Sequence, residues 1–340
     1  MASVSVTTGS RFHPGLICGT ADSGWRFGGI GFMMQSPQWR LCIRRLSDHR
    51  DRVTFSTGVG QQLSESARTG LSRRIATVLD LMRADRDGLH VEVLDAAPMH
   101  GGFGAGTQLA LGVGAGIDVL KHGRRTLTAR ALASKLDRST RSAVGTAGFE
   151  SGGFLLDRGV EAQGDERRVE RFSIPDQWRW VIVKPTDSVG LCGTQEVEFF
   201  QRRATMPGQL VRDLEKILLQ QLIPALQQQD FDRFASALAE YGRQVGGFYA
   251  DSQGGVFACD EMNSLAVRLQ DAGFPGAAQS SWGPSIGIPA QSPAMADAVR
   301  DEILASPPSC SVQLLTVEPM NCGARILSEA PSVADDTRLI

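Results

Sequence analysis

The sequence predicts an α+β fold of two domains, because strand-like and helix-like patterns alternate along a chain of 340 residues. The first 60 residues hold strand-like runs separated by glycine, proline and charged turns. A strand, a glycine-rich loop and a helix then follow one another between residues 89 and 120. The second half adds amphipathic helices and further strands.

The first part of the chain is expected to form a meander of strands and then a helix. The strand-like runs are residues 31–34, 39–45 and 53–56. Residues 64–84 carry apolar side chains at the i, i+3, i+4 spacing of an amphipathic helix, and this spacing predicts one buried face: Leu71, Ile75, Val78, Leu79 and Met82. Residues 89–93 alternate like a further strand.

The glycine-rich loop at residues 98–107 is the most informative segment. It stands between a strand and the expected helix at 108–120. Glycines let backbone N–H groups approach an anion closely, and a helix N-terminus adds about half a positive charge. The loop has neither the lysine of a Walker A motif nor GxGxxG spacing. A phosphate site and a purely structural turn both fit this pattern.

The rest of the chain continues the alternation of helices and strands. Helices are expected at residues 130–136, 209–229, 231–241, 260–272 and 292–304, and strands at 154–157, 180–183, 311–317 and 324–326. The pattern lapses between residues 185 and 207, which predicts a domain boundary there. The last residues are polar and are expected to fray.

The charge balance argues against a nucleic-acid-binding protein. The chain has 35 basic and 37 acidic side chains, a formal net charge of −2 and a pI near 6.2. Binding to nucleic acid usually needs a strongly positive surface. Only four of the basic residues are lysine, so the other 31 are arginine, whose planar fork suits carboxylates and phosphates.

The sequence also predicts a soluble cytoplasmic protein. Its first twenty residues lack the charged start and apolar run of a signal peptide, and no stretch of eighteen apolar residues occurs. The six cysteines are scattered, without a CxxC pair or a histidine at metal-ligand spacing. They are expected to be reduced and mostly buried thiols.

Six motifs occur in a specific order. They are SRFHPGL at 10–16, RFGGIGF at 26–32, GFGAGTQLAL at 102–111, RSAVGTAGFESGGFLLD at 141–157, QGG at 253–255 and QSSWGPS at 279–285. In this order they resemble the β-ribofuranosylaminobenzene 5'-phosphate synthase family of the GHMP kinase superfold, over residues 10–328. The resemblance implies an N-terminal ribosomal-protein-S5-like domain at 1–190, a C-terminal ferredoxin-like α+β domain at 191–328 and a flexible tail at 329–340.

The resemblance implies that the glycine-rich loop is the superfold's phosphate loop, usually written PxxxGLGSS. Phe103 stands where leucine is usual, and Ala105 replaces a serine. The glycine spacing and a threonine hydroxyl remain, so anion binding is expected. The implied phosphate-binding residues are Gly101, Gly102, Gly104, Ala105, Gly106, Thr107 and Ser142.

The second motif of the superfold's kinases is SGxD, in which the aspartate acts as a base or stabilises charge. Alignment on the pair Gly152-Gly153 places that aspartate at Gly145. A glycine cannot deprotonate a hydroxyl, so the chain is not expected to be an ordinary small-molecule kinase unless Glu150 or another acid substitutes.

The reaction implied by the resemblance is a decarboxylating phosphoribosyl transfer. 5-Phosphoribosyl 1-diphosphate condenses with 4-aminobenzoate or 4-hydroxybenzoate, forms a carbon–carbon bond and releases diphosphate and carbon dioxide, in tetrahydromethanopterin biosynthesis. Mg²⁺ is the expected cofactor, without an organic one, and the metal ligands stay unassigned. The candidate catalytic residues are His100, Arg141 and Glu150. The candidate substrate contacts are Arg11, His13, Arg26, Gln253, Ser280, Ser281 and Trp282.

Two other functions stay open at this point. One is an ATP-dependent small-molecule kinase of the same superfold, against which Gly145 argues. The other is a phosphate- or nucleotide-binding protein without catalysis, which the departures at Phe103 and Ala105 favour. The choice between the two aromatic acids also stays open, as does the oligomeric state, for which a homodimer is one candidate.

Overall fold

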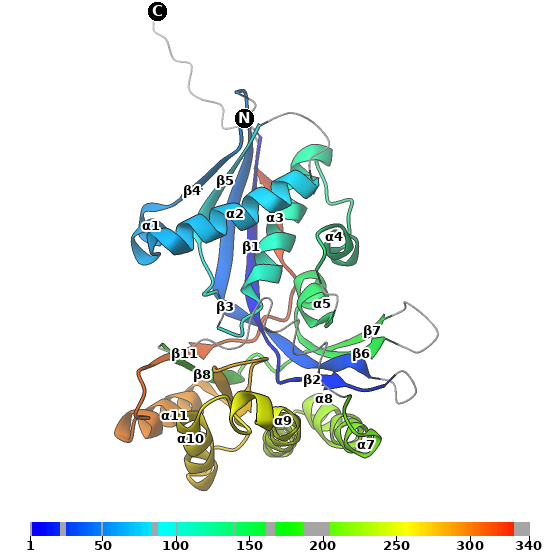
Figure 1. Cartoon of the computed structure of the whole chain (residues 1–340), viewed down its shortest axis with the longest axis vertical. Coiled ribbons are helices and arrows are strands. Elements are labelled where there is room, and N and C mark those ends of the chain that lie inside the picture. Colours follow the sequence, from blue (N-terminus) through cyan, green and yellow to red (C-terminus); the bar gives the residue numbers. More distant parts are fainter. Residues whose placement is uncertain are drawn as a thin grey trace, which may run out of the picture.

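The computed structural model describes residues 2–20, 25–48, 50–82, 88–99, 101–138, 141–160, 167–186 and 205–329. In these ranges the chain forms an eight-stranded sheet and a four-stranded sheet. Figure 1 shows the first sheet with its helices in the upper part of the molecule and the second sheet with its helices below. This mixed arrangement of sheets and helices confirms the predicted α+β class.

The first sheet is organised around one very long strand, β3 (Arg26–Leu46), of 21 residues. The main order is β12-β1-β3-β5-β4, with β2 and β6 also paired to β3, and β7 paired to β6. The other strands are β1 (Ser3–Phe12), β2 (Leu16–Cys18), β4 (Arg52–Phe55), β5 (Gly88–Asp95), β6 (Phe154–Val160), β7 (Arg167–Phe172) and β12 (Arg325–Glu329). The two strands expected at 31–34 and 39–45 are therefore parts of β3.

β3 remains one strand through a local irregularity in its middle. Its pairing with β1 shifts register between Thr8 and Ser10. Opposite this shift, the Ser10 hydroxyl donates a hydrogen bond of 2.5 Å to the carbonyl of Pro37. Residues 40–46 of β3 pair with β5, and residues 26–32 pair with β6. One strand thus pairs with different strands of the first sheet along its length.

Helices cover one face of the first sheet: α1 (Thr57–Gln62), α2 (Glu65–Met82), α3 (Ala105–His122), α4 (Ala129–Lys135) and α5 (Val144–Ser151). The five apolar residues expected to face inward from α2 are all buried. α3 is buried along most of its length because it lies between the sheet and the other helices. A Cβ on Gly116 would lie 2.4 Å from Cδ1 of Ile43, so a larger residue there would require the Ile43 side chain to move.

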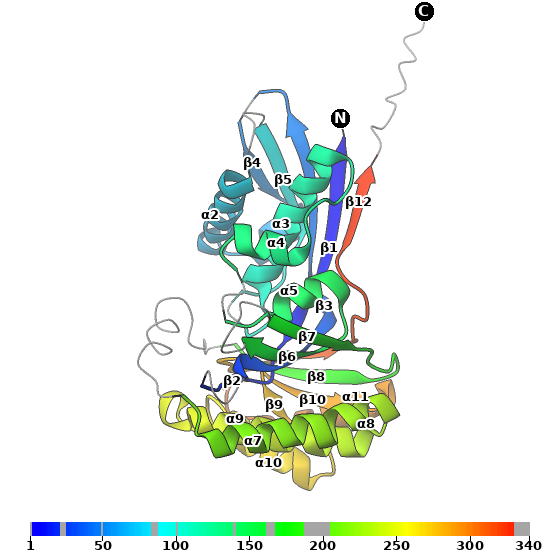
Figure 2. The same cartoon turned by 90° about the vertical axis from the view of Figure 1, so that its right-hand side faces the viewer.

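The lower sheet has the order β11-β8-β10-β9. Its strands are β8 (Arg179–Pro185), β9 (Ala278–Gln279), β10 (Ile286–Ala290) and β11 (Val312–Val317). Figure 2 shows its helices on the side away from the first sheet. These are α7 (Gly208–Ile217) with its continuations η1 (Leu218–Leu222) and α8 (Ile223–Gln228), followed by α9 (Phe231–Gln253), α10 (Asp260–Asp271) and α11 (Pro293–Ala305).

The two sheets share one hydrophobic core. Phe32 of β3 packs on Trp180 of β8 with ring centroids 4.3 Å apart. Trp180 in turn meets Phe234 of α9 edge-on at 6.4 Å. All three side chains are fully buried in one cluster. The upper and lower parts of the molecule are therefore joined by packing and not only by the chain.

The two sheets do not divide the chain at one position. The boundary expected near residue 190 falls in 187–204, outside the described residues. β8 precedes that stretch and lies in the lower sheet, whereas β12 follows the lower part and pairs with β1 in the first sheet. Residue 329 ends β12, and the rest of the expected tail lies outside the described residues.

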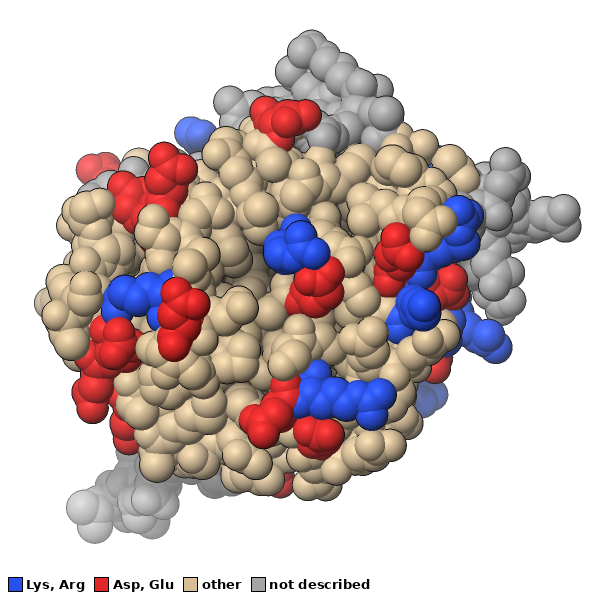
Figure 3. All heavy atoms as spheres, turned by 90° about the horizontal axis from the view of Figure 1, so that it is seen from below, with Lys and Arg blue, Asp and Glu red and all other residues tan. Residues whose placement is uncertain are grey.

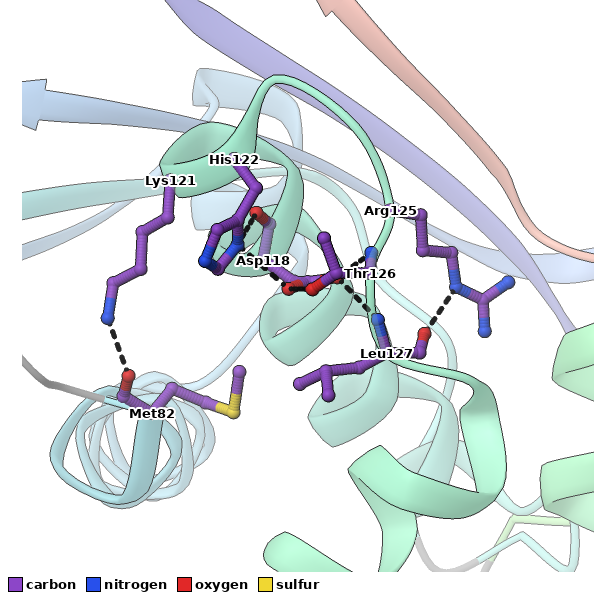
Figure 4. A network of polar contacts seen from close by, with 7 residues as sticks. All are labelled: Met82, Asp118, Lys121, His122, Arg125, Thr126 and Leu127. Atoms are coloured by element: carbon purple, nitrogen blue, oxygen red, sulfur yellow. Dashed lines mark hydrogen bonds and ion pairs between the residues drawn. The ribbon is translucent and has the colours of Figure 1, made fainter.

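A buried carboxylate ties the end of α3 to the loop before α4. Asp118 accepts hydrogen bonds from the backbone N–H groups of Thr126 (2.6 Å) and Leu127 (2.9 Å) and from the Thr126 hydroxyl (2.5 Å), as Figure 4 shows. His122 lies 3.1 Å from the same carboxylate. Burial alone would raise the pKa of Asp118, but these hydrogen bonds hold it below its usual range.

Removal of this carboxylate is expected to destabilise the fold. In Asp118→Ala, two loop N–H groups lose their acceptor, and the free energy of unfolding should fall by about 2–3 kcal/mol. Urea unfolding at pH 7 measures the change. Asp80→Ala, at an exposed position of α2, is the control and should stay within about 0.5 kcal/mol of wild type. Equal stability of Asp118→Ala and wild type would contradict the assignment.

Three observations on the described residues bear on the expected partners and on the cysteines. None of the helices within the described ranges is long and apolar enough to cross a membrane. On the lower face, Figure 3 shows acidic and basic side chains interspersed.

Five free cysteines lie in the described residues. Four are partly exposed and Cys322 is exposed, so the expectation that the cysteines are mostly buried was wrong for these five.

Candidate functional site

A cavity of about 310 Å³ lies where the two parts of the molecule meet. It is called here the central cavity. Its walls come from the β1–β2 turn, the start of α3, the segment between α4 and α5, helix α9 and the turn after β9. The lining residues are Arg11, His13, Pro14, Gly15, Leu16, Thr107, Asp137, Arg138, Arg141, Ser142, Gly242, Val245, Gly246, Tyr249, Gln253, Val256, Gln279, Ser281 and Trp282.

One wall of the central cavity is cationic. It carries Arg11 from the end of β1 and Arg138 and Arg141 from the segment before α5. Thr107 and Ser142 add hydroxyl groups to the same lining. Arginine forks and hydroxyls form charge-assisted hydrogen bonds with phosphate and carboxylate oxygens. This wall is suited to an anionic ligand.

The wall formed by α9 and the QSSWGPS segment is aromatic. The Tyr249 and Trp282 rings meet edge to face at 5.1 Å, and Val245 and Val256 extend the apolar surface. The Tyr249 hydroxyl donates to the Leu16 carbonyl at 2.9 Å, which fixes the ring. An aromatic ring of a ligand can pack on such a surface.

His13 lines the cavity as a buried, neutral imidazole. Its Nε2 lies 3.0 Å from the Ser142 hydroxyl, and its backbone carbonyl accepts from the Ser281 N–H at 2.8 Å. Burial, together with the charge of Arg11, lowers the pKa of His13 to about 3. At neutral pH the ring therefore acts as a hydrogen-bonding group and carries no charge.

The buried carboxylate of Asp157 lies close to Ser142. Asp157 accepts hydrogen bonds from the N–H groups of Ala143 (2.7 Å) and Gly159 (2.9 Å) and lies 3.7 Å from Arg167. Burial raises the pKa of Asp157, although Arg167, these N–H groups and the Ser142 hydroxyl oppose the shift. Asp157 thus holds the segment that carries Ser142 at the cavity.

The glycine-rich loop packs tightly against the rest of the protein. The Ser280 hydroxyl donates to the Gly102 carbonyl at 2.7 Å, and the Ser285 hydroxyl donates to the Gly101 carbonyl at 2.9 Å. Gly104 has a φ of 64°, and a Cβ there would lie 2.5 Å from the Arg11 side chain. These glycines therefore allow two protein surfaces to approach each other.

Gly145, the position to which the resemblance assigns the kinases' aspartate, lies beside the Arg11 side chain. A Cβ on Gly145 would lie 3.5 Å from Cδ and Nε of Arg11 and 3.4 Å from the methyl group of Thr107. Gln108 anchors this point by donating to the Gly145 carbonyl at 2.7 Å.

Comparison with known proteins gives a consistent result. No family model matches the chain. A β-ribofuranosylphenol 5'-phosphate synthase of Methanothermobacter thermautotrophicus is 28% identical over 83% of this chain and 87% of its own length. Proteins of the same name from Archaeoglobus fulgidus and Methanocaldococcus jannaschii are 27% and 25% identical, each over 68% of this chain and over 72% and 75% of their own lengths.

This chain is a homologue of the β-ribofuranosylphenol 5'-phosphate synthases. The similarity confirms the predicted resemblance and the prediction that the chain is an enzyme. Solved structures confirm the GHMP-kinase-like fold. A phosphomevalonate kinase of Streptococcus pneumoniae has a TM-score of 0.67 at 12% identity, over 94% of this chain and all of its own. A homoserine kinase of Cytophaga hutchinsonii has a TM-score of 0.62 at 14% identity, over 96% of this chain and 97% of its own.

In this synthase homologue, eight of the seventeen residues expected at the site do meet. The central cavity brings them together: Arg11, His13, Thr107, Arg141, Ser142, Gln253, Ser281 and Trp282. Two of the expected substrate contacts serve the protein itself. The Ser280 hydroxyl accepts from the His13 N–H at 3.1 Å. The Gln253 amide donates to the carbonyls of Gly255 and Val256 and accepts from Gln279.

Other expected site residues lie elsewhere. The Glu150 carboxylate is exposed and accepts from Arg125 and from the Ala129 N–H, both at 2.6 Å, which argues against a catalytic role. Arg26 is exposed over the Phe27 ring. The expected loop residues that do not line the central cavity are Gly101, Gly102, Gly104, Ala105 and Gly106. His100 lies outside the described residues.

Sequence reasoning missed several residues of the lining. Arg138 and Asp137 follow α4 in a segment that reads as an ordinary charged surface. Tyr249 lies four residues before the QGG motif, on a helix, α9, that was expected to end at Tyr241. Val245 and Tyr249 are four residues apart, as on one face of a helix. This spacing could have extended the predicted helix beyond Tyr241.

The lining offers little to hold a divalent metal by itself. In the described part of the chain, no group of three His, Cys, Asp or Glu side chains is placed to bind one. Asp137 and the Thr107 hydroxyl are the oxygen donors of the lining that suit Mg²⁺. Mg²⁺ commonly binds to one or two protein oxygens and to substrate phosphates, so these residues fit a metal that arrives with a diphosphate.

Proposed function

We propose that this chain is a cytoplasmic enzyme of tetrahydromethanopterin biosynthesis that transfers the phosphoribosyl group of 5-phosphoribosyl 1-diphosphate to an aromatic acid with loss of carbon dioxide. The observation that carries the proposal is the composition of the central cavity, in which an arginine wall and an edge-packed aromatic pair enclose the same space. The first wall suits a diphosphate and the second a benzoate ring. The similarity to proteins named β-ribofuranosylphenol 5'-phosphate synthases supports the assignment.

The first step is departure of diphosphate from the anomeric carbon. Positive charge develops on that carbon while negative charge grows on the leaving oxygen, so the site must stabilise the leaving anion more strongly in the transition state than in the ground state. Arg11, Arg138 and Arg141 are the residues placed to do this. Mg²⁺ supplies further charge neutralisation when it is bound to the diphosphate.

The second step joins the sugar to the ring. A bond forms between the anomeric carbon and the ring carbon that carries the carboxylate. The bond from that carbon to the carboxylate then breaks, its electron pair returns to the ring, and carbon dioxide leaves. No proton has to be removed from the ring in this sequence, which agrees with a cavity whose histidine, His13, has a pKa lowered to about 3.

The aromatic acceptor is best tested first as 4-hydroxybenzoate. The three curated relatives are named for a ribofuranosylphenol product, whose ring carries a hydroxyl group. 4-Aminobenzoate differs only in the para substituent and is the second acceptor to test. Packing of either ring on Tyr249 and Trp282 excludes water from the carboxylate and thereby eases its loss.

The decisive experiment measures labelled carbon dioxide. Each carboxyl-labelled acid is incubated with the purified chain and Mg²⁺, with and without 5-phosphoribosyl 1-diphosphate. Release is expected only with the ribosyl donor, with one diphosphate formed for each carbon dioxide. Absence of release from both acids, together with ATP consumption in the presence of a small alcohol, would instead support the kinase function that the solved structures of this fold carry.

A further inference from the structure

The backbone of His13 is fixed by hydrogen bonds to two other segments of the cavity wall. Its N–H donates to the Ser280 hydroxyl at 3.1 Å. Its carbonyl accepts from the N–H groups of Gly15 (2.6 Å) and Ser281 (2.8 Å). A carbonyl oxygen has two lone pairs, so both are already used. The imidazole ring therefore has no free acceptor on its own carbonyl and depends on other side chains.

The Ser142 hydroxyl is the partner of one ring nitrogen. Its oxygen lies 3.0 Å from Nε2 of His13 and accepts from the Val144 N–H at 3.2 Å. It also forms a side-chain hydrogen bond with Asp157. These groups meet because α5, which begins at Val144, lies against the hairpin of β6 and β7, as Figure 2 shows, and β6 carries Asp157. Three partners thus surround one hydroxyl.

The charge on Asp157 decides the direction of these hydrogen bonds. Asp157 is fully buried, accepts from two backbone N–H groups and lies 3.7 Å from Arg167. Burial raises the pKa of Asp157, but these neighbours favour the ionised form. An ionised carboxylate only accepts hydrogen bonds, so it takes the proton of the Ser142 hydroxyl. The two lone pairs of that hydroxyl are then left for the Val144 N–H and for an N–H at Nε2 of His13.

The other ring nitrogen, Nδ1, opens into the central cavity. Nδ1 has no hydrogen-bond partner among the described residues. Five buried side-chain atoms in that part of the chain lack a partner, and Nδ1 is not one of them. Since His13 lines the central cavity, Nδ1 is accessible from it. In a neutral ring that is protonated at Nε2, Nδ1 carries a lone pair and acts as an acceptor.

This lone pair selects the kind of ligand group that His13 can contact. Phosphate and carboxylate oxygens also carry lone pairs, so they gain nothing from an acceptor. A hydroxyl or amino group, in contrast, can donate to Nδ1. The arginines of the cavity wall suit the anionic groups of a substrate, whereas His13 suits a neutral donor of the same substrate.

We propose that Asp157, acting through Ser142, holds His13 in the tautomer protonated at Nε2, and that Nδ1 accepts a hydrogen bond from a neutral O–H or N–H group of the substrate. Asp157 is thus a positioning residue. The donor has two possible sources: a ribose hydroxyl, or the para hydroxyl or amino group of the aromatic acid. The tautomer is independent of the proposed function, whereas the bond to the substrate rests on it.

The tautomer is tested by nitrogen NMR of the intact chain with ¹⁵N-labelled histidine. The chain has five histidines, and the signals of His13 are those that His13→Gln lacks. Wild type is expected to show a protonated Nε2 and an unprotonated Nδ1. In Asp157→Asn the amide can donate to Ser142, which then donates to Nε2, so the form protonated at Nδ1 should appear. Ser142→Ala should lose the single wild-type form, and Ser142→Thr, which keeps the hydroxyl, should retain it.

Asp118→Asn is the matched control for Asp157→Asn. It also changes a buried carboxylate that accepts from two backbone N–H groups, but Asp118 does not line the central cavity. The tautomer of His13 should not change in it. If Asp157→Asn does not fold, the Ser142 variants carry the test. A wild-type ring protonated at Nδ1, or a wild-type tautomer in Ser142→Ala, would overturn the role of Asp157.

Titration of the labelled protein with small probes identifies the donor. If the donor is a ribose hydroxyl, ribose 5-phosphate shifts the Nδ1 resonance and inorganic phosphate does not. If it is the para group, 4-hydroxybenzoate shifts the resonance and benzoate does not. Ser142→Ala should weaken binding of the probe that causes the shift about three- to tenfold, the usual effect of one neutral hydrogen bond, and Ser142→Thr should restore it.

Carbon dioxide release, measured separately, distinguishes failure of this proposal from failure of the proposed function. An Nδ1 resonance that neither ribose 5-phosphate nor 4-hydroxybenzoate shifts would overturn the bond to the substrate, even if carbon dioxide is released. A shifted resonance without any release would support the bond and contradict the proposed function alone.

Discussion

Replacement of Arg11 by glutamine is expected to lower kcat/KM for carbon dioxide release by about 10²–10³-fold, the usual cost of removing one group that stabilises transition-state charge. Arg11 lines the central cavity and packs against Gly104 and Gly145. Its backbone N–H donates to the Phe103 carbonyl at 2.9 Å, so the chain position of the side chain is fixed. Glutamine keeps part of the packing and removes the charge.

The matched control for Arg11→Gln is Arg26→Gln. Both residues lie on neighbouring strands of the first sheet, but Arg26 is exposed and does not line the central cavity. Its substitution is expected to leave kcat/KM within about twofold of wild type. Steady-state kinetics with labelled acid measure both variants, and thermal melting confirms that both are folded. Equal rates in Arg11→Gln and Arg26→Gln would remove Arg11 from the reaction.

The free energy of unfolding is expected to fall as the pH drops below 6.5, because of His13. In the folded state the pKa of His13 is lowered to about 3, whereas in the unfolded chain it has the ordinary value of 6.5. Between these values the unfolded state binds a proton that the folded state does not, so acid favours unfolding. The contribution of His13 is about 1.4 kcal/mol per pH unit in this window and about 4–5 kcal/mol over its whole width.

Urea unfolding at pH 7 and pH 5 measures this effect. Wild type should lose about 2 kcal/mol more than His13→Gln between the two pH values, since glutamine does not titrate. The variant itself is expected to be less stable at pH 7, because the ring is buried and bonded to Ser142. The comparison therefore uses the difference between pH values within each protein. An identical pH dependence of the two proteins would contradict a buried neutral His13.

Most of the longer helices of this fold follow from the sequence, whereas α1, α5 and several strands were not predicted. The apolar spacing of α2 predicts its buried face correctly because that helix has one exposed side. β1 was not among the predicted strands, although Val4 and Val6 alternate with serine as in a strand buried on one face; its partners β3 and β12 lie far away in the chain. β3 was divided in two at Pro37, since a proline usually ends a strand and the pairing that sustains this one is non-local.

Site residues in motifs that contain glycine and proline could be predicted from the sequence. Site residues in segments with the composition of an ordinary exposed surface could not. His13, Ser142 and Trp282 lie in segments whose glycines and prolines bring them together, and they meet in the cavity. The glycine-rich loop shows why composition alone is ambiguous. Its glycines lack Cβ atoms, which could leave space for a phosphate. In this protein the space is taken by Arg11 and Ser280. Arg138 gave no signal, because its role depends on the packing of α4 against α5.

The pairing of β12 with β1 has a consequence for how the protein is made. Ser3 stands opposite Glu329 in the first sheet, so one edge of that sheet is completed by a strand synthesised more than 300 residues later. Until the ribosome has released residues 325–329, β1 offers an unpaired edge to the surrounding solution. The first sheet is therefore completed only once residues 325–329 have been synthesised, and until then that edge of β1 is open to pairing with other chains.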